Sequence, residues 1–164
     1  MATQVYFGLG SNLGDKSLNI NRATELLGEL LADATGIKLS GLYKTEPDGF
    51  TAQSWFLNAA CSLSTDLDVF GVMSAVFTIQ SAFESRSGLL NSPREIDIDI
   101  LMYGDLRLNA PGLIIPHPRM AYRDFVLAPL AEIAPQTLHP VFAVTIFSLL
   151  TELRDRRCRQ NLIF

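Results

Sequence analysis

Long apolar runs and a framework of cysteines are both missing from this sequence of 164 residues. No apolar run reaches the ~18 residues that a membrane-spanning helix requires, and the first residues lack the basic group that opens a signal peptide. Only two cysteines are present, Cys61 and Cys158, which is too few for a disulfide-rich secreted domain. We therefore expect a cytoplasmic protein without a membrane segment. Cys61 lies in an apolar strand pattern and is expected to be a small buried side chain.

An excess of positive charge is also missing, because the net charge is −4. This balance argues against a general attraction to nucleic acid. A hydrophobic content of 48% against 18% charged residues excludes an intrinsically disordered chain. The length fits one domain with a substantial core, so residues 1–164 are expected to form a single domain. Several arginines gather between Arg86 and Arg123, which indicates a local site for an anion.

Hydrophobic periodicity predicts an alternation of strands and helices along the chain. The predicted strands cover residues 4–8, 37–45, 57–65 and 95–103, with short pieces at 106–108 and 113–115. Helices are predicted at 16–34, ended by Gly36, at 68–84, with Thr65 or Asp66 as N-cap, and once or twice within 125–153. This order of elements is that of the ferredoxin-like α+β sandwich (βαββαβ), here with C-terminal additions. It implies an antiparallel sheet with helices on one face, which leaves the other face and the loops for ligands.

Two aspartates alternate with isoleucines in the last long strand, within the segment from Arg94 to Ile100. Since alternate residues of a strand share a face, the isoleucines point into the core, and Asp97 and Asp99 project together from the other side. Two carboxylates about 6 Å apart repel by roughly 3 kcal/mol at an effective dielectric constant near 20, and a divalent cation removes that repulsion. Oxygen ligands from only two carboxylates suit Mg²⁺, which keeps several waters or phosphate oxygens. The alternative is a wet strand face that happens to carry aspartates, although aspartate is a poor strand former.

A histidine held between prolines forms a second polar cluster. The prolines on either side of His117 fix the backbone there, and the residues that follow closely include Arg119, Arg123 and Phe125. A histidine, two arginines and an aromatic ring within a short segment can clamp a phosphate. The cluster is therefore interpreted either as a phosphate clamp or as a structural loop.

A third cluster runs from Tyr43 to Asn58 through a loop that contains Pro47 and Gly49. Such a loop turns backbone amides and carbonyls toward a common point. Asn58 offers both a donor and an acceptor, and Phe56 can stack on a flat ring. The same residues also fit a plain turn followed by a strand, so the sequence leaves both interpretations open.

Two other segments are interpreted as structural. The glycine-rich segment from Gly8 to Gly14 matches neither of the common glycine motifs for nucleotides, and we predict a tight turn between strand and helix there. The arginines from Arg154 to Arg159 are expected to form the solvated end of a helix.

Together, in this order and spacing, the clusters resemble the 6-hydroxymethyl-7,8-dihydropterin pyrophosphokinases of folate biosynthesis, over about residues 4 to 150. The segments that carry the resemblance are Gly8-Leu-Gly-Ser-Asn12, the series Tyr43, Thr45, Pro47, Gly49, Gln53, Phe56 and Asn58, Pro93-Arg94-x-Ile-Asp97-Ile-Asp99, Pro116-His117-Pro118-Arg119-Met120, Arg123-x-Phe-Val-Leu-x-Pro129-Leu130, Glu132-Ile-Ala-Pro and His139-Pro140. The resemblance implies a ferredoxin-like monomer that transfers the terminal diphosphate of ATP to the hydroxymethyl group of the pterin and releases AMP.

The same resemblance implies roles for individual residues. Asp97 and Asp99 would bind two Mg²⁺ ions that bridge the triphosphate, with Arg94 and Arg86 as further catalytic residues. The implied nucleotide contacts are Arg94, Ile100, His117 and Arg123. The implied pterin contacts are Thr45, Glu46, Asp48 and Asn58 along the edge of the ring and Phe56 and Phe125 on its two faces.

The chain departs from the family pattern in the loop before Arg94. Relatives often carry Trp-Gly where this sequence has Asn91-Ser92, and a second loop arginine where it has Ser85. Two other functions are compatible with the clusters. A non-catalytic module could bind a small ligand or nucleic acid, although the sequence lacks aromatic strand motifs that stack RNA bases. A metal-dependent phosphohydrolase would use the same carboxylates but needs a base that activates water, and His117 fits a clamp better.

Overall fold

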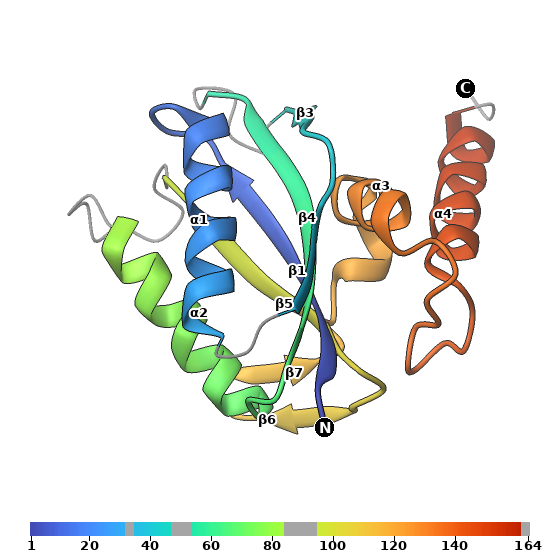
Figure 1. Ribbon diagram of the computed structural model, residues 1–164. Coiled ribbons are helices and arrows are strands. Elements are labelled where there is room, and N and C mark those ends of the chain that lie inside the picture. The colour runs from blue at the N-terminus through green and yellow to red at the C-terminus, as the bar shows by residue number, and fades with distance from the viewer. Residues whose placement is uncertain (32–34, 47–53, 84–94, 162–164) are drawn as a thin grey trace.

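The computed structural model describes residues 1–31, 35–46, 54–83 and 95–161 of the chain (Figure 1). Its elements are, in order, β1 (Thr3–Ser11), α1 (Lys16–Leu30), β2 (Thr35–Leu39), β3 (Tyr43–Thr45), β4 (Phe56–Thr65), α2 (Val69–Phe83), β5 (Asp97–Tyr103), β6 (Leu108–Ala110), β7 (Leu113–Ile115), the 3-10 helix η1 (Met120–Tyr122), α3 (Asp124–Ile133) and α4 (Ile146–Asn161). In this part of the chain, no helix combines the length and the apolar character that crossing a membrane requires.

A mixed α/β fold is built on an antiparallel sheet with the strand order β2-β4-β1-β5. The strand β3 also pairs with β4, and β6 and β7 form a separate hairpin. The predicted single strand at 37–45 is therefore two strands along one edge of β4. Ser40 lies between them, and its hydroxyl, rather than a backbone carbonyl, accepts the hydrogen bond from the Ala60 amide at 2.9 Å. Because the Ser40 hydroxyl takes the place of a backbone acceptor, the backbone hydrogen-bond ladder with β4 is interrupted here.

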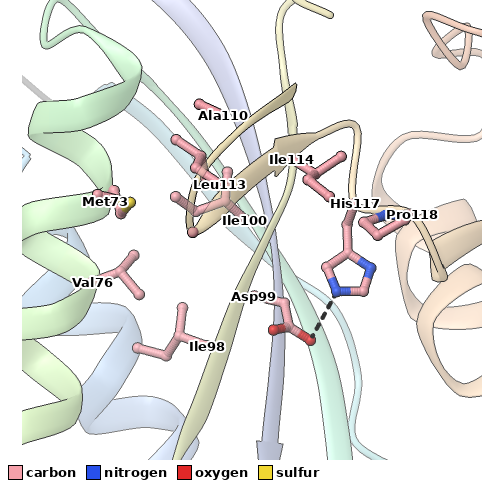
Figure 2. Close-up of a pocket in the computed structure, with 11 residues that line it drawn as sticks. Met73, Val76, Ile98, Asp99, Ile100, Ala110, Leu113, Ile114, His117 and Pro118 are labelled. Carbon is pink, nitrogen blue, oxygen red and sulfur yellow. Dashed lines mark ion pairs between the residues drawn. The ribbon is translucent and has the colours of Figure 1, made fainter. Parts of the chain in front are cut away.

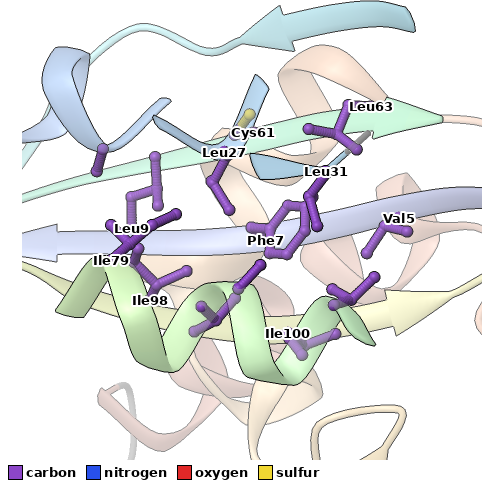
Figure 3. Packing of buried hydrophobic residues seen from close by; sticks show 14 of the residues in the cluster. Val5, Phe7, Leu9, Leu27, Leu31, Cys61, Leu63, Ile79, Ile98 and Ile100 are labelled. Atoms are coloured by element: carbon purple, nitrogen blue, oxygen red, sulfur yellow. The ribbon is translucent and has the colours of Figure 1, made fainter. Parts of the chain in front are cut away.

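One face of the sheet packs against α1 and α2 and forms the larger hydrophobic core (Figure 1). Alternate residues of the central strands enter this core, among them Phe7, Leu9, Cys61, Ile98 and Ile100 (Figure 3). Cys61 is fully buried, and burial raises the pKa of its thiol to about 12. The prediction that Cys61 is a buried apolar side chain is thus confirmed.

The second face of the sheet is partly covered by α3, with α4 packed outside it (Figure 1). The apolar residues on this face, such as Tyr6 and Leu101, pack with Leu127 and Leu130 of α3 and Leu149 of α4. The prediction that this whole face is left for ligands is therefore wrong. Its physical reason is that one end of β1 and β5 carries large apolar side chains on this face, and they need cover from water.

The end of β1 and the end of α1 both differ from the predictions that were based on glycines. β1 continues to Ser11, so the segment that begins at Gly8 is not a tight turn, because Gly8 and Gly10 pair with both β4 and β5. The first helix ends at Leu30, and Gly36 lies within β2 with a φ of +64°. Gly36 therefore serves an irregularity of the strand, where a left-handed backbone is needed, and does not end the helix.

An aspartate caps the N-terminus of α1 and another that of α2, the two helices packed on the larger core. The carboxylate of Asp15 accepts a hydrogen bond from the Leu18 amide at 3.0 Å, and that of Asp68 accepts from the Gly71 amide at 2.8 Å. The N-cap of α2 is therefore Asp68, and not Thr65 or Asp66 as predicted. The Thr65 hydroxyl instead accepts from the Leu67 amide at 3.2 Å, in the turn before the helix.

The connection between α3 and α4 is organised by His139, which is 3% exposed. Its Nδ1 accepts hydrogen bonds from the amides of Val141 at 3.2 Å and Phe142 at 3.3 Å, and its ring lies 4.6 Å from that of Phe142. Burial lowers the pKa of His139 from its ordinary value. The neutral ring therefore closes this turn, since a protonated Nδ1 cannot accept either bond.

We expect the stability of the protein to decrease below pH 6.5, in part through His139. Between the unfolded pKa of 6.5 and the lower folded pKa, the unfolded chain binds a proton that the native chain does not, so unfolding becomes easier as the pH falls. Melting temperatures of the wild type and of His139→Asn, measured from pH 7.5 to pH 5, test this. Asparagine keeps an oxygen acceptor for the same amides without titrating, so the variant should lose less stability over this range. Parallel curves for the two proteins would contradict the prediction.

Candidate active site on the open half of the sheet

The aspartates of β5 lie on the open half of the second sheet face. Ile96, Ile98 and Ile100 are 4%, 4% and 8% exposed and belong to the larger core, whereas Asp97 and Asp99 are half-buried on the opposite face. The alternation predicted from the sequence is confirmed. The Asp99 side chain is 39% exposed, so a ligand can reach its carboxylate.

Two glycines of β1 form the floor beside these aspartates. Gly10 pairs with Asp97 on one side and with Asn58 on the other, and Gly8 pairs with Asp99. A Cβ at Gly10 would lie 3.4 Å from Oδ1 of Asn58, so a side chain there would crowd the asparagine. Because Asn58 and Asp97 flank the same residue, their Cα atoms are two strand spacings apart, about 10 Å. The glycine segment thus joins two clusters that the sequence analysis treated separately.

His117 enters the site from the segment after β7, where the Ile115–Pro116 peptide is cis. Its Nε2 lies 3.9 Å from Oδ2 of Asp99 (Figure 2), and its backbone amide donates to the carbonyl of Leu101 at 2.9 Å. The Nδ1 accepts a hydrogen bond from the Arg119 amide at 3.2 Å. In the neutral ring the proton therefore resides on Nε2, which faces the aspartates.

The protonation of His117 follows from its surroundings. Its side chain is 17% exposed. Burial lowers the pKa of His117 from its ordinary value, the charge of Asp99 opposes this effect without cancelling it, and Arg123 adds to the lowering. A neutral His117 donates one hydrogen bond from Nε2, which suits a phosphate oxygen beside the aspartates.

A pocket of about 370 Å³ opens next to His117 and Asp99 (Figure 2). Its apolar wall comes from α2, from the edge strand β5 and from the β6–β7 hairpin, through residues such as Met73, Val76 and Ile114. Ile100 also lines it. The pocket residues from α2 and the hairpin were not predicted from the sequence. The sequence signals for the hairpin are the short strand pieces predicted at 106–108 and 113–115, observed at Leu108–Ala110 and Leu113–Ile115, and Pro111-Gly112 between them, where Gly112 has a φ of +80°.

The predicted pterin residues gather on the other side of Gly10. Tyr43 and Thr45 of β3 pair with Asn58 and Phe56 of β4. The Asn58 amide donates to the Thr45 hydroxyl at 2.7 Å, and Asn58 is 7% exposed. This bond fixes the orientation of the Asn58 amide, because its nitrogen is turned toward Thr45.

Phe125 lies in the first turn of α3 and packs partly buried against the smaller core. The guanidinium of Arg123 lies 5.5 Å from the centre of its ring, within cation–π range. Among the other predicted site residues, Glu46 is exposed. Asp48, Arg86 and Arg94 lie outside the described residues, so their predicted roles stay predictions.

The donor set at Asp97 and Asp99 fits Mg²⁺. Both residues offer carboxylate oxygens on one face of one strand, and the described residues contain no group of three or more His, Cys, Asp and Glu side chains that could enclose a metal. Mg²⁺ is commonly bound by one or two carboxylates, with waters and phosphate oxygens as its remaining ligands. Asp97 and Asp99 are thus the described residues that would hold this ion.

Comparisons with known proteins show to which family the sequence is similar. The family model for 7,8-dihydro-6-hydroxymethylpterin-pyrophosphokinase (HPPK) matches residues 6–135. The 2-amino-4-hydroxy-6-hydroxymethyldihydropteridine pyrophosphokinase of Methylorubrum extorquens is 41% identical over 136 residues, which cover 81% of this chain and 84% of that protein.

Two longer proteins contain a similar region. The folic acid synthesis protein FOL1 of Dictyostelium discoideum is 39% identical over 142 residues, which cover 86% of this chain but only 21% of that protein. The crystal structure of Plasmodium falciparum HPPK-DHPS with pteroate superposes with a TM-score of 0.76 at 16% identity, over 99% of this chain and 44% of that one. At this identity the likeness concerns the fold, which is a mixed α/β fold with an antiparallel sheet.

Proposed function

This chain belongs to the 7,8-dihydro-6-hydroxymethylpterin-pyrophosphokinase family, and we propose that it transfers the diphosphate of ATP to 6-hydroxymethyl-7,8-dihydropterin in folate biosynthesis. The products are AMP and the pterin diphosphate. The observation that carries this proposal is the row Asn58, Gly10 and Asp97 across three adjacent strands. The Cα atoms of Asn58 and Asp97 are about 10 Å apart on one sheet face, which supports a flat polar ring bound at the first residue and a metal-bound polyphosphate at the second.

For the architecture, we assign the chain to the ferredoxin-like βαββαβ sandwich with C-terminal additions, as a single domain over residues 1–164. The strand order β2-β4-β1-β5 and the antiparallel pairing support this assignment when β2 and β3 are counted as one interrupted strand. We also expect a cytosolic monomer that binds neither nucleic acid nor membrane. These expectations stay predictions, and light scattering on the purified protein tests the monomer.

On the nucleotide side, the adenine base occupies the apolar pocket beside Ile100, and the triphosphate extends toward Asp97 and Asp99. A pocket of about 370 Å³ that has Asp99 and His117 at its polar edge supports this orientation. His117 donates from Nε2 to a phosphate oxygen, and Arg123 adds positive charge nearby. In this proposal Arg94 and Arg86, which lie outside the described residues, complete the phosphate contacts.

On the pterin side, Asn58 bonds the polar edge of the ring, together with groups near Thr45, Glu46 and Asp48. The bond from Asn58 to Thr45 supports this role because it holds the amide in one orientation. Phe56 and Phe125 cover the two faces of the ring. A flat molecule with a polar edge fits two aromatic rings and one asparagine.

The residues act mainly by positioning and by balancing charge, as is usual for phosphoryl-type transfer. The pterin hydroxymethyl oxygen attacks the β-phosphorus, and the bond from that phosphorus to the oxygen of the α-phosphate breaks. The electron pair leaves with AMP, and the proton of the hydroxyl group passes to solvent. Asp97 and Asp99 would hold Mg²⁺, with two ions expected, and the metal would supply positive charge that neutralises the triphosphate. The neutral His117 stabilises the charge of the departing oxygens by hydrogen bonding.

Product analysis tests the proposal directly. The purified protein is incubated with ATP, Mg²⁺ and 6-hydroxymethyl-7,8-dihydropterin, and the products are separated by anion-exchange chromatography. We expect AMP and pterin diphosphate in equal amounts, and no AMP when the pterin is left out. Formation of ADP or free phosphate would support a phosphohydrolase instead, and binding without turnover would support a ligand-binding module.

A further inference from the structure

The carboxylate of Glu132 connects α3 to the edge of the sheet. Its Oε1 accepts a hydrogen bond from the Gly41 amide at 3.0 Å, and its Oε2 accepts one from the Tyr43 hydroxyl at 2.8 Å. Gly41 lies in the connection between β2 and β3, and Tyr43 is the first residue of β3. One side chain near the end of α3 is thus bonded both to β3, the strand that carries Thr45, and to the connection that precedes it.

Glu132 and Phe125 share one face of α3, since they are seven residues apart. Pro129 lies between them within the helix. A proline has no amide hydrogen, so Pro129 cannot donate to the carbonyl of Phe125 as a regular helix residue would. The carbonyl of Phe125 therefore lacks its usual partner within α3, so contacts with other elements contribute more to the position of this turn.

Two such contacts lie at opposite ends of α3. At the start, both carboxylate oxygens of Asp124 accept from Arg154 of α4, at 2.7 Å and 3.2 Å. At the end, Glu132 binds Tyr43 and Gly41. Of these two polar contacts, the second joins the helix to β3 and the connection before it, in addition to the apolar packing of α3 against β1 and β4.

We propose that Glu132 is a positioning residue for the dihydropterin site, which holds Phe125 on α3 at a fixed place relative to Thr45 and Asn58 on the sheet; this inference rests on the proposed function. Tyr43 lies opposite Asn58 in the register of β3 and β4, and Asn58 donates to Thr45. Tyr43 and Phe125 both pack against the smaller core. The two halves of the ring site are thus joined through Glu132.

The chemistry of the contact requires a carboxylate at position 132. The Tyr43 phenol is a donor at neutral pH, as an ordinary tyrosine is, and its bond to Glu132, burial and the charge of Glu132 raise the pKa of Tyr43 further. Both partners of Glu132 donate, and a carboxylate accepts at both oxygens. A glutamine has one accepting oxygen and one donating nitrogen, so it can satisfy only one of the two donors. The isosteric substitution Glu132→Gln therefore removes half of the contact and leaves the shape unchanged.

The test compares Tyr43→Phe, Glu132→Gln and the double variant with the wild type. Calorimetry measures binding of the pterin and, separately, of a non-hydrolysable ATP analogue with Mg²⁺. We expect each single variant to weaken pterin binding about fivefold, as for one partly exposed hydrogen bond, and the double variant to be no weaker than the weaker single one. ATP analogue affinity should stay within about twofold, which also shows that the variants fold.

A second readout follows the contact itself, independent of activity. Tyrosine ionisation, recorded by absorbance against pH, should include one group of raised pKa that is absent in Tyr43→Phe and ionises at lower pH in Glu132→Gln. Glu25→Gln is the matched control, since Glu25 is exposed on α1 and pairs only with Arg22 among its described contacts. It should change neither ligand affinity nor the tyrosine titration.

The outcomes separate this inference from the proposed function. Unchanged pterin affinity in the variants, or equal losses for pterin and ATP analogue, would overturn the positioning role, while AMP production by the wild type would still support the proposed function. If the wild type binds no pterin, the proposed function fails and this inference fails with it.

Discussion

Replacing Asp97 or Asp99 with alanine is expected to reduce diphosphate transfer about a thousandfold, which corresponds to roughly 4 kcal/mol of transition-state stabilisation. Both carboxylates leave the same face of β5, and Asp99 lies 3.9 Å from the imidazole of His117. Removing either one takes away half of the proposed protein ligands for Mg²⁺, so the negative charge of the triphosphate is less well neutralised. The rate of AMP formation at saturating ATP and pterin, followed over a range of Mg²⁺ concentrations, measures the effect.

The fold should tolerate these substitutions, because the side chains lie at the open face and not in the core. We expect melting temperatures within a few degrees of the wild type, since changes outside cores are usually worth less than about 1 kcal/mol. Asp105→Ala is the matched control, as Asp105 is an exposed aspartate in the turn after β5. Wild-type rates in Asp97→Ala or Asp99→Ala would refute the assignment, and so would equal losses in the Asp105 control.

Replacing Asn58 with alanine is expected to weaken pterin binding roughly ten- to a hundredfold and to leave ATP binding nearly unchanged. The amide is buried, at 7% exposure, and is oriented by its 2.7 Å bond to Thr45. A site that bonds a polar ring edge with a fixed amide loses more than one hydrogen bond when the amide is removed. Calorimetry with the pterin and with an ATP analogue measures the two affinities separately.

Two further variants sharpen this prediction. Thr45→Val removes the hydroxyl that holds the amide, so it should weaken pterin binding in the same direction but by less than Asn58→Ala. Asn109→Ala, in the exposed part of the β6–β7 hairpin, is the matched control and should bind the pterin as the wild type does. Equal losses of pterin and ATP affinity in Asn58→Ala would show that the asparagine supports the fold and not the ligand.

Local patterns in the sequence predicted most of the strands and helices correctly. The alternation of isoleucine and aspartate predicted which side chains of β5 are buried, because the two faces of a strand are set by the backbone alone. The apolar pattern around Cys61 predicted its burial for the same reason. The errors concern the bounds of elements. Gly36, Thr65 and Asp66 were assigned to helix ends that lie elsewhere, the strand predicted at 37–45 is two strands, and the turn predicted from Gly8 is part of β1.

The relation between Asn58, Gly10 and Asp97 could not be predicted from local patterns. Each lies in a different strand, and their proximity depends on the strand order of the sheet. The prediction of an open second face failed for a related reason. Whether the sheet's apolar end is covered depends on where α3 and α4 pack, and this is decided by contacts between residues far apart in the chain.

By itself, the sequence determined the alternation of buried and exposed residues in β5 and the identity of the two metal-binding candidates, because these follow from residue type and local spacing, and its motifs carried the resemblance to the family. Only the tertiary structure decided which clusters share a site, that the proton of a neutral His117 resides on Nε2, and that Glu132 joins α3 to β3. The physical reason is that hydrogen bonds and burial depend on distances between atoms, and residues distant in sequence acquire those distances only when the sheet is assembled.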